Sequence, residues 1–241
     1  MGCCETRETL PRAPREGQKI ALGQMGLVTI SGYQPIQRVF DQPSQALLEY
    51  VHTLLDSAEW NAVYTEDWFE LETLQHSAYR ENLQVSKFCL KFNQCLDSEI
   101  VFEMLNSPEL RMEWDTSIAQ MNIEEGDLKS CFTAYRVMSR LSFKRDFLEK
   151  KFVGADEGSL VSIAYSVEGK ESKITRGYTY FSYLRVIPVK GTTQVVLVNQ
   201  TDTQLPTQTF AKLACVQMKS WAKTFFKQLI KAHPKPNNEQ A

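Results

Sequence analysis

The stretch PTQTFAKLACVQMKSWAKTFFKQLIK, residues Pro206 to Lys231, decides the fold that we predict for the whole chain. It has no glycine and no proline after its first position, and proline suits the first turn of a helix, where an N–H would lack a partner. At about 100° per residue the stretch has two faces. The apolar arc contains Phe210, Leu213, Ala214, Gln217, Met218, Trp221, Phe225 and Leu229, and the opposite side carries Lys212, Lys219, Lys223 and Lys227. We therefore predict a long, cationic, amphipathic helix.

Each face of this helix has two interpretations. The apolar arc can pack on a sheet as ordinary core, or it can also close over an apolar ligand. The lysines can form a solvated face, or they can meet an anionic membrane surface. The sequence of the helix alone does not distinguish these alternatives.

The segments before the helix predict the rest of the architecture. A helix is expected after Pro43, strands near residues 68–73 and 83–92, and two short helices beginning near Asp97 and at Ser107, which is a good N-cap. Six β-rich segments follow, at Ile118–Ile123, Cys131–Ser139, Asp146–Val153, Leu160–Val167, Gly177–Val189 and Gln194–Thr201. Because short loops join these segments, successive strands should pair antiparallel. We predict an α+β fold in which one curved sheet of about nine strands wraps the C-terminal helix and leaves an apolar space between them.

Composition excludes several classes of function. The chain has 241 residues, 43% hydrophobic and 23% charged, with a formal net charge of −2, which argues against a nucleic-acid binder with a basic surface. No segment approaches the roughly 18 apolar residues of a transmembrane helix. The six cysteines form no CxxC pair and have no histidine at metal-ligand spacing, so we predict neither a metal site nor a disulfide scaffold.

The first six residues, Met-Gly-Cys-Cys-Glu-Thr, fit the pattern for N-myristoylation of Gly2. Cys3 and Cys4 are well placed for palmitoylation, and two acyl chains anchor a protein firmly where one alone binds only marginally. The sequence therefore predicts a protein held at the cytoplasmic face of a membrane. Residues 1–42 are expected to form an acylated anchor and flexible tether, residues 43–233 the globular domain, and residues 234–241 a polar tail.

Several short motifs, in this order and spacing, resemble the START (StAR-related lipid transfer) domain family, within the helix-grip fold. They are Trp114-Asp115, Arg145-Asp146-Phe147, Arg176-Gly177, Val186-Ile187-Pro188 and Asn199-Gln200-Thr201-Asp202 with Leu205-Pro206. The resemblance covers roughly Ser44 to Lys231. It implies a single hydrophobic tunnel that holds one lipid, with the C-terminal helix as its lid.

The resemblance also implies roles for individual residues. In phospholipid-carrying members an arginine at the place of Arg111 binds the lipid phosphate, and Tyr180 falls where an aromatic ring contacts choline. The choline-facing tryptophan of those members corresponds to Ala134 here, so the match is partial. A surface or helix-capping role remains the alternative for Arg111, and packing is the favoured role for Trp114. The lipid-binding side chains that we predict are Arg111, Tyr135, Tyr180, Phe210, Leu213, Met218, Trp221 and Phe225.

Membrane-facing residues are predicted in two places. The loop at residues 140–144 would stand beside the lid, where Leu141 and Phe143 alternate with basic residues and suit insertion into a bilayer. The lysines of the last helix, Lys219, Lys223 and Lys227, would face the membrane surface. Family members usually have a Lys-Gly pair before the lid, and this chain instead has Thr203 and Gln204.

Strand alternation places Tyr178, Tyr180 and Ser182 on one face of their strand and Thr179, Phe181 and Tyr183 on the other. Spacing alone does not indicate which set faces the cavity.

Three functions from different classes follow. The first is a membrane-tethered carrier or sensor of one lipid, preferably a phospholipid, with no cofactor beyond that lipid. The second, an enzyme, is disfavoured because the sequence offers only His52, His76 and His233 and no nucleophile elbow or phosphate loop. The third is a protein-interaction module with a vestigial pocket, which a cavity below about 300 Å³ would favour. No protein partner is assigned.

Overall fold

The computed structural model describes residues 32–57, 59–75, 77–93, 96–138, 144–169, 172–190, 192–204 and 207–232, with the side chains of the last helix from Gln217 to Lys231. The predictions at Gly2, Cys3, Cys4, Leu141 and Phe143, and the side chains of Phe210 and Leu213, lie outside the described residues.

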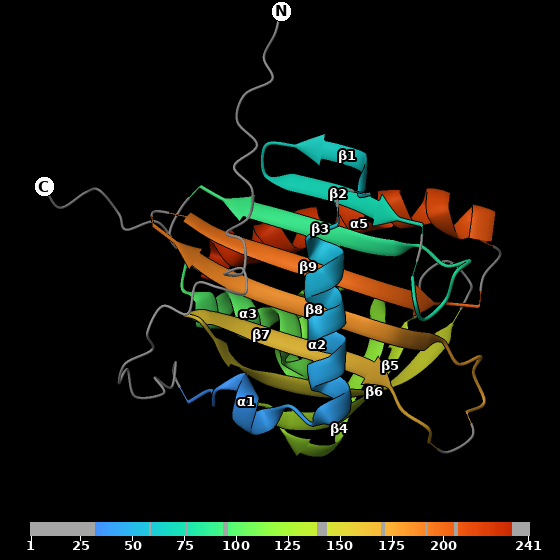
Figure 1. Cartoon of the computed structure of the whole chain (residues 1–241), viewed down its shortest axis with the longest axis horizontal. Coiled ribbons are helices and arrows are strands. Elements are labelled where there is room, and N and C mark those ends of the chain that lie inside the picture. The colour runs from blue at the N-terminus through green and yellow to red at the C-terminus, as the bar shows by residue number, and fades with distance from the viewer. Residues whose placement is uncertain are drawn as a thin grey trace, which may run out of the picture.

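One curved, antiparallel sheet forms the body of the molecule (Figure 1). Its nine strands lie in the order β1-β2-β3-β9-β8-β7-β6-β5-β4. They are β1 (Asn61–Glu66), β2 (Phe69–Leu74), β3 (Val85–Phe92), β4 (Ile118–Asp127), β5 (Cys131–Met138), β6 (Arg145–Asp156), β7 (Ser159–Ser166), β8 (Tyr178–Val189) and β9 (Thr192–Asp202). The predicted α+β helix-grip class is confirmed. Strand β1 showed no periodic signal because it is an edge strand, largely open to solvent, and needs no apolar face.

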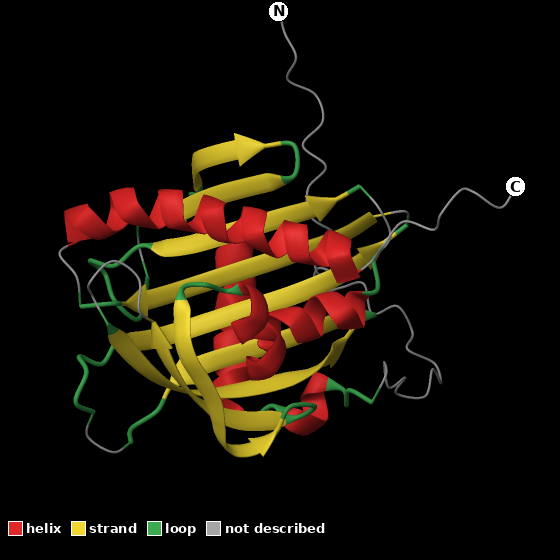
Figure 2. Ribbon diagram, turned by 180° about the vertical axis from the view of Figure 1, so that it is seen from behind, coloured by secondary structure: helices red, strands yellow, loops and turns green. Residues whose placement is uncertain are grey.

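Helices cover both faces of this sheet. They are α1 (Ile36–Val39), α2 (Gln42–Leu55), α3 (Ser98–Asn106), α4 (Pro108–Trp114) and α5 (Thr207–Ala232). Helix α2 crosses the outer face (Figure 1), and α3, α4 and the long α5 lie against the opposite, concave face (Figure 2). The predicted N-cap is confirmed, since the Ser107 hydroxyl accepts a hydrogen bond from the Leu110 N–H and Pro108 occupies the first helical position.

The two faces of the sheet carry separate apolar cores. Under α1 and α2, Val51 belongs to one core with Phe152, Ile163, Phe181 and Val198. On the concave face, a second core joins the helices to the sheet through Phe88, Leu90, Phe102, Trp114, Phe132, Leu184, Phe225 and Leu229. Because alternate residues of each strand enter different cores, the face of a strand residue decides whether it can reach the space under α5.

The packed domain begins earlier than the predicted boundary at residue 43. Tyr33, Ile36 and Phe40 are buried, and the Tyr33 ring meets Phe102 edge-to-face at 5.3 Å between centroids. The Ala155 N–H donates to the Gln34 carbonyl at 2.8 Å, which ties this segment to β6. The end of the predicted tether is therefore part of the fold. Its apolar residues lie in and around α1, a helix of only 4 residues, which is too short to show a helical period in the sequence.

Candidate functional site

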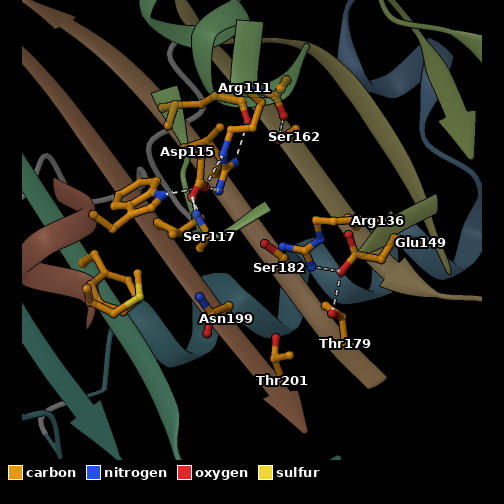
Figure 3. A pocket seen from close by; sticks show the side chains of 18 of the residues that line it. Arg111, Asp115, Ser117, Arg136, Glu149, Ser162, Thr179, Ser182, Asn199 and Thr201 are labelled. Atoms are coloured by element: carbon orange, nitrogen blue, oxygen red, sulfur yellow. Dashed lines mark hydrogen bonds and ion pairs between the residues drawn. The ribbon is translucent and has the colours of Figure 1, made fainter. Parts of the chain in front are cut away.

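A cavity lies between the concave face of the sheet and helices α4 and α5, with a volume of about 210 Å³. Strands β3, β8 and β9 supply an apolar side through Phe88, Leu90, Leu184, Val195 and Leu197, and helix α5 supplies Met218 and Trp221. Polar side chains from helices α3 and α4 and from strands β5 to β9 line much of the remainder (Figure 3). The cavity is therefore amphipathic, with an apolar side and a charged end.

The first charged pair joins α4 to helix α5. Arg111 and Asp115 are four residues apart on α4, and the Arg111 Nη2 and Nε atoms each lie 2.8 Å from Asp115 Oδ2. The same carboxylate oxygen accepts a hydrogen bond from the Trp221 indole at 3.0 Å, and Arg111 also donates to the Leu105 carbonyl at 3.0 Å. Burial raises the pKa of Asp115, but the Arg111 charge and hydrogen bonds from Ser117 outweigh it, and the pKa lies below its ordinary value. The pair is thus ionised and anchors α5 on α4.

The second charged pair lies on the sheet. Arg136 Nη2 on β5 is 2.8 Å from Glu149 Oε1 on β6, and the same oxygen accepts a hydrogen bond from the Thr179 hydroxyl at 2.6 Å (Figure 3). Burial raises the pKa of Glu149, but the charge of Arg136 and the Thr179 hydrogen bond bring it below its ordinary value. Arg136 also stacks over the Phe147 ring at 4.7 Å. This pair is a fixed, ionised part of the cavity wall.

The family comparisons give matches only among solved structures. No family model matches the chain, and no curated protein matches it. Human StAR-related lipid transfer protein 5 aligns with a TM-score of 0.71 and 18% identity, over 80% of this chain and 97% of its own. Human STARD10 aligns with a TM-score of 0.69 and 15% identity, over 80% and 81%. The human StarD13 (DLC2) lipid transfer and protein localization domain aligns with a TM-score of 0.59 and 14% identity, over 79% and 97%.

The chain has the START fold. The resemblance predicted from the motifs is confirmed at the level of the fold, which is what identities below one fifth establish.

The START motifs meet in space. Arg176 Nη2 lies 3.0 Å from Asp146 Oδ2, so the motif that opens β6 is paired with the one before β8. Gly177 lies against the Phe147 ring, where an added Cβ would stand 2.3 Å from Cε1. Glycine is required there because the ring of Phe147 is completely buried and has no room to move.

Within this START fold, the predicted lipid-binding residues divide into three groups. Arg111, Met218 and Trp221 line the cavity. Phe225 is completely buried behind them, with its ring 4.9 Å from that of Trp114 and 5.8 Å from that of Trp221. Trp114 packs as expected, and its indole donates to the Met104 carbonyl at 2.9 Å.

Tyr135 and Tyr180 form the third group, which lies away from the cavity. Tyr180 packs against the core of the outer face, and Tyr135 hydrogen-bonds Asp146. A bulge in β8 between Thr179 and Phe181 breaks the strict alternation, so Thr179 and Ser182 both line the cavity. Alternation alone could not predict this, because a one-residue bulge reverses the faces beyond it.

The sequence prediction missed most of the polar lining. Arg136, Glu149 and Lys151 line the cavity from the sheet, and Asn199 and Thr201 line it from β9. Residues 149–151 of β6 read EKK, so charged residues lie on both faces of this strand. The sequence therefore does not indicate that Glu149 and Lys151 face inward. The only available signal was the position of Asn199 and Thr201 inside a START motif.

The predicted membrane-facing lysines are not equivalent. Lys219 Nζ lies 2.9 Å from Glu66 Oε1 and 4.1 Å from the centre of the Tyr64 ring, so this lysine is held against the β1–β2 hairpin. Lys223 and Lys227 are exposed. On the described part of α5, Lys223, Lys227 and Lys231 therefore present the exposed cationic surface.

The connection into the lid helix is held by β6. The Arg145 Nε donates to the Thr203 carbonyl at 2.6 Å, and Gln204 has a φ of 57°, in the left-handed region. The departure from the Lys-Gly pair thus places a non-glycine residue in a conformation that costs about 1 kcal/mol. The Arg145 contact thus ties the segment before α5 to the start of β6.

The described residues contain no group of three side chains suited to hold a metal ion. None of the described helices is both long and apolar enough to span a bilayer.

Proposed function

We propose that the protein binds one lipid molecule in the cavity under α5 and carries or senses that lipid at a membrane surface. The amphipathic cavity is the observation that supports this most directly, because an apolar side joined to a charged end matches a molecule with a tail and a headgroup. Structures that share the fold include a human lipid transfer protein and a human lipid transfer domain. No covalent chemistry is required for this function.

The volume of the cavity constrains the ligand. About 210 Å³ accommodates about seven water-sized groups at roughly 30 Å³ each, which corresponds to part of one acyl chain or to a compact ring system. Burial of such a chain contributes about 0.8 kcal/mol per methylene group. A diacyl phospholipid, which the sequence favoured, would need α5 to move outward and enlarge the space. We therefore propose a single-chain or compact lipid as the resident ligand.

Membrane attachment is the second part of the proposal. Acyl chains on Gly2 and on Cys3 and Cys4 would hold the protein at the cytoplasmic face of a membrane. Exposed Lys223 and Lys227 lie on the outer side of the lid helix, where anionic headgroups would attract them. This arrangement brings the lid close to the surface from which lipid is exchanged.

A protein-interaction module with a vestigial pocket is the second candidate. The volume of the cavity favours this second candidate, because about 210 Å³ lies below the roughly 300–1,000 Å³ of typical ligand pockets. The charged lining is difficult to reconcile with a vestigial pocket, because buried charges are costly and are expected to disappear from a space without a ligand.

Two measurements separate these candidates. Native mass spectrometry of full-length protein purified from the cytoplasm should show a bound lipid, and delipidated protein should take up radiolabelled lipid from liposomes. Ser182→Phe, which fills the cavity, should abolish uptake, whereas Ser57→Phe, at the end of α2, should leave it unchanged. Absence of both the retained lipid and the uptake by the wild-type protein would refute lipid binding and favour the interaction module.

A further inference from the structure

The charged side chains that line the cavity do not balance. The described lining contains three cationic groups, on Arg111, Arg136 and Lys151, and two anionic groups, on Asp115 and Glu149. Arg111 pairs with Asp115 and Arg136 pairs with Glu149, each at 2.8 Å. The cavity therefore retains one positive charge, and Lys151 carries it.

The surroundings of Lys151 hold it in place without neutralising it. Its Nζ donates to Asn106 Oδ1 at 3.2 Å, and the same oxygen accepts a hydrogen bond from the Ser162 hydroxyl at 3.0 Å. The Asn106 amide in turn donates to the Phe102 carbonyl at 2.9 Å, which fixes its orientation. An ammonium group has three donors, and one is used here. Among the described residues, no carboxylate forms an ion pair with Lys151.

A second lining group has unused hydrogen-bonding capacity. The Nε atom of Arg136 is buried and has no hydrogen-bond partner among the described residues. Unsatisfied buried donors are uncommon in folded proteins, and each one calls for an explanation such as strain, a functional role or a bound water or ion. The side chains of Arg136 and Lys151 both line the charged end of the cavity.

An unbalanced charge in this setting is unfavourable. Burial, opposed by the charge of Glu149 and assisted by the charges of Arg111 and Arg136, lowers the pKa of Lys151 to about 8. A bound anion would reverse this effect and would remove the cost of the isolated charge.

We propose that the lipid held in the cavity carries a single negative charge on its headgroup, as a carboxylate does, and that Lys151 provides the charge that neutralises it. This inference rests on the proposed function and names the class of its ligand. A monoanion matches the one excess positive charge, whereas a phosphate monoester carries about −1.5 to −2 and exceeds it. The apolar chain of the ligand would lie along Leu184, Leu197, Met218 and Trp221.

The test compares three single-chain lipids on the full-length protein by equilibrium dialysis at pH 7. Hexadecanoate carries one negative charge, hexadecanol none, and lysophosphatidylcholine no net charge. We expect hexadecanoate to bind at least 10-fold more tightly than hexadecanol or lysophosphatidylcholine. In Lys151→Met this preference should disappear while hexadecanol binding is kept. Lys150→Met is the matched control, since Lys150 lies on the opposite face of β6, 3.5 Å from Asp41, and its loss should leave the preference intact.

The pH dependence gives an independent readout. As the pH rises from 7 to 9.5, Lys151 loses its proton, so the affinity for hexadecanoate should fall about 10-fold. The other charged groups that face it are those of Arg111, Arg136, Asp115 and Glu149, and the two carboxyl groups have a lowered pKa and stay ionised over this range. Lys151→Arg retains the charge without the titration, so its preference for hexadecanoate should persist at pH 9.5.

The outcomes separate the inference from the proposed function. If none of the three lipids binds the wild-type protein, the proposed function fails. If hexadecanol or lysophosphatidylcholine binds as tightly as hexadecanoate, the cavity binds lipid but the inference about its headgroup is refuted. If Lys151→Met does not fold, the pH profiles of the wild-type and Lys151→Arg proteins decide, and a preference unaffected by pH in the wild type would overturn the role of Lys151.

Discussion

Replacing Asp115 by asparagine tests how the lid helix is held on the domain. The Asp115 carboxylate accepts hydrogen bonds from Arg111 and from the Trp221 indole of α5, and its side chain is only 2% exposed. Asparagine preserves the shape but removes the charge, so the Arg111 guanidinium, 18% exposed, is left without its counter-ion. Removing one partner of a buried ion pair typically costs about 3–5 kcal/mol. Because the guanidinium retains some solvent access, we expect a loss near the lower end, about 3 kcal/mol.

Urea unfolding at pH 7, followed by tryptophan fluorescence, measures this loss. A decrease of about 3 kcal/mol corresponds to a fall in Tm of roughly 10 °C for a domain of this size. The double variant Arg111→Met with Asp115→Leu removes both charges, so it should be more stable than Asp115→Asn alone. A loss below about 1 kcal/mol for Asp115→Asn, or strictly additive losses in the corresponding double-mutant cycle, would refute the role assigned to the pair.

The pH dependence of stability has a defined sign. The pKa of Asp115 is lower in the folded protein than in the unfolded chain, so its contribution is present above the unfolded value of about 4. That contribution is lost as the pH falls through the lower, folded value. Asp115→Asn should therefore lose less stability than the wild type between pH 5 and pH 2, and identical acid profiles would contradict this account.

Three further predictions concern packing and the membrane. Gly177→Ala should lower the unfolding free energy by about 1–3 kcal/mol, because its Cβ would overlap the buried Phe147 ring, and an unchanged urea midpoint would contradict this. Lys223→Gln should weaken binding to anionic vesicles about fivefold, from roughly 1 kcal/mol per lysine. Lys219→Gln should weaken it less because that lysine is already paired, and equal effects in vesicle sedimentation would count against the assignment. Gly2→Ala should move the protein from the membrane to the soluble fraction of cells, and an unaltered distribution on fractionation would exclude N-terminal acylation as the anchor.

Local patterns were sufficient for most of the architecture. The long helix after residue 206 followed from an apolar arc that recurs at the helical period, and Ser107 with Pro108 marked the start of α4. The six strands from β4 to β9 followed from β-rich segments separated by short turns. These features depend on neighbouring residues in the chain, so the sequence contains them directly.

Patterns failed where a residue's environment depends on distant partners. Tyr33 is core because β6 and α3 present a site for it, and nothing in its own segment indicates this. Tyr180 faces the outer core and Thr179 the cavity because the β8–β9 pairing contains a bulge. A bulge reflects the register of two strands, which the sequence of one strand does not specify.

The sequence by itself determined the helix-grip order of elements, the lid helix with its lysines and the motifs that resemble START domains. The tertiary structure alone decided which charges meet in the cavity. Arg111 and Asp115 are neighbours on one helix, but Arg136 and Lys151 reach the same space from β5 and β6, and Asn106 reaches it from α3. The balance of charge in a cavity is a sum over elements that only folding brings together, so the excess charge on Lys151 could not be read along the chain.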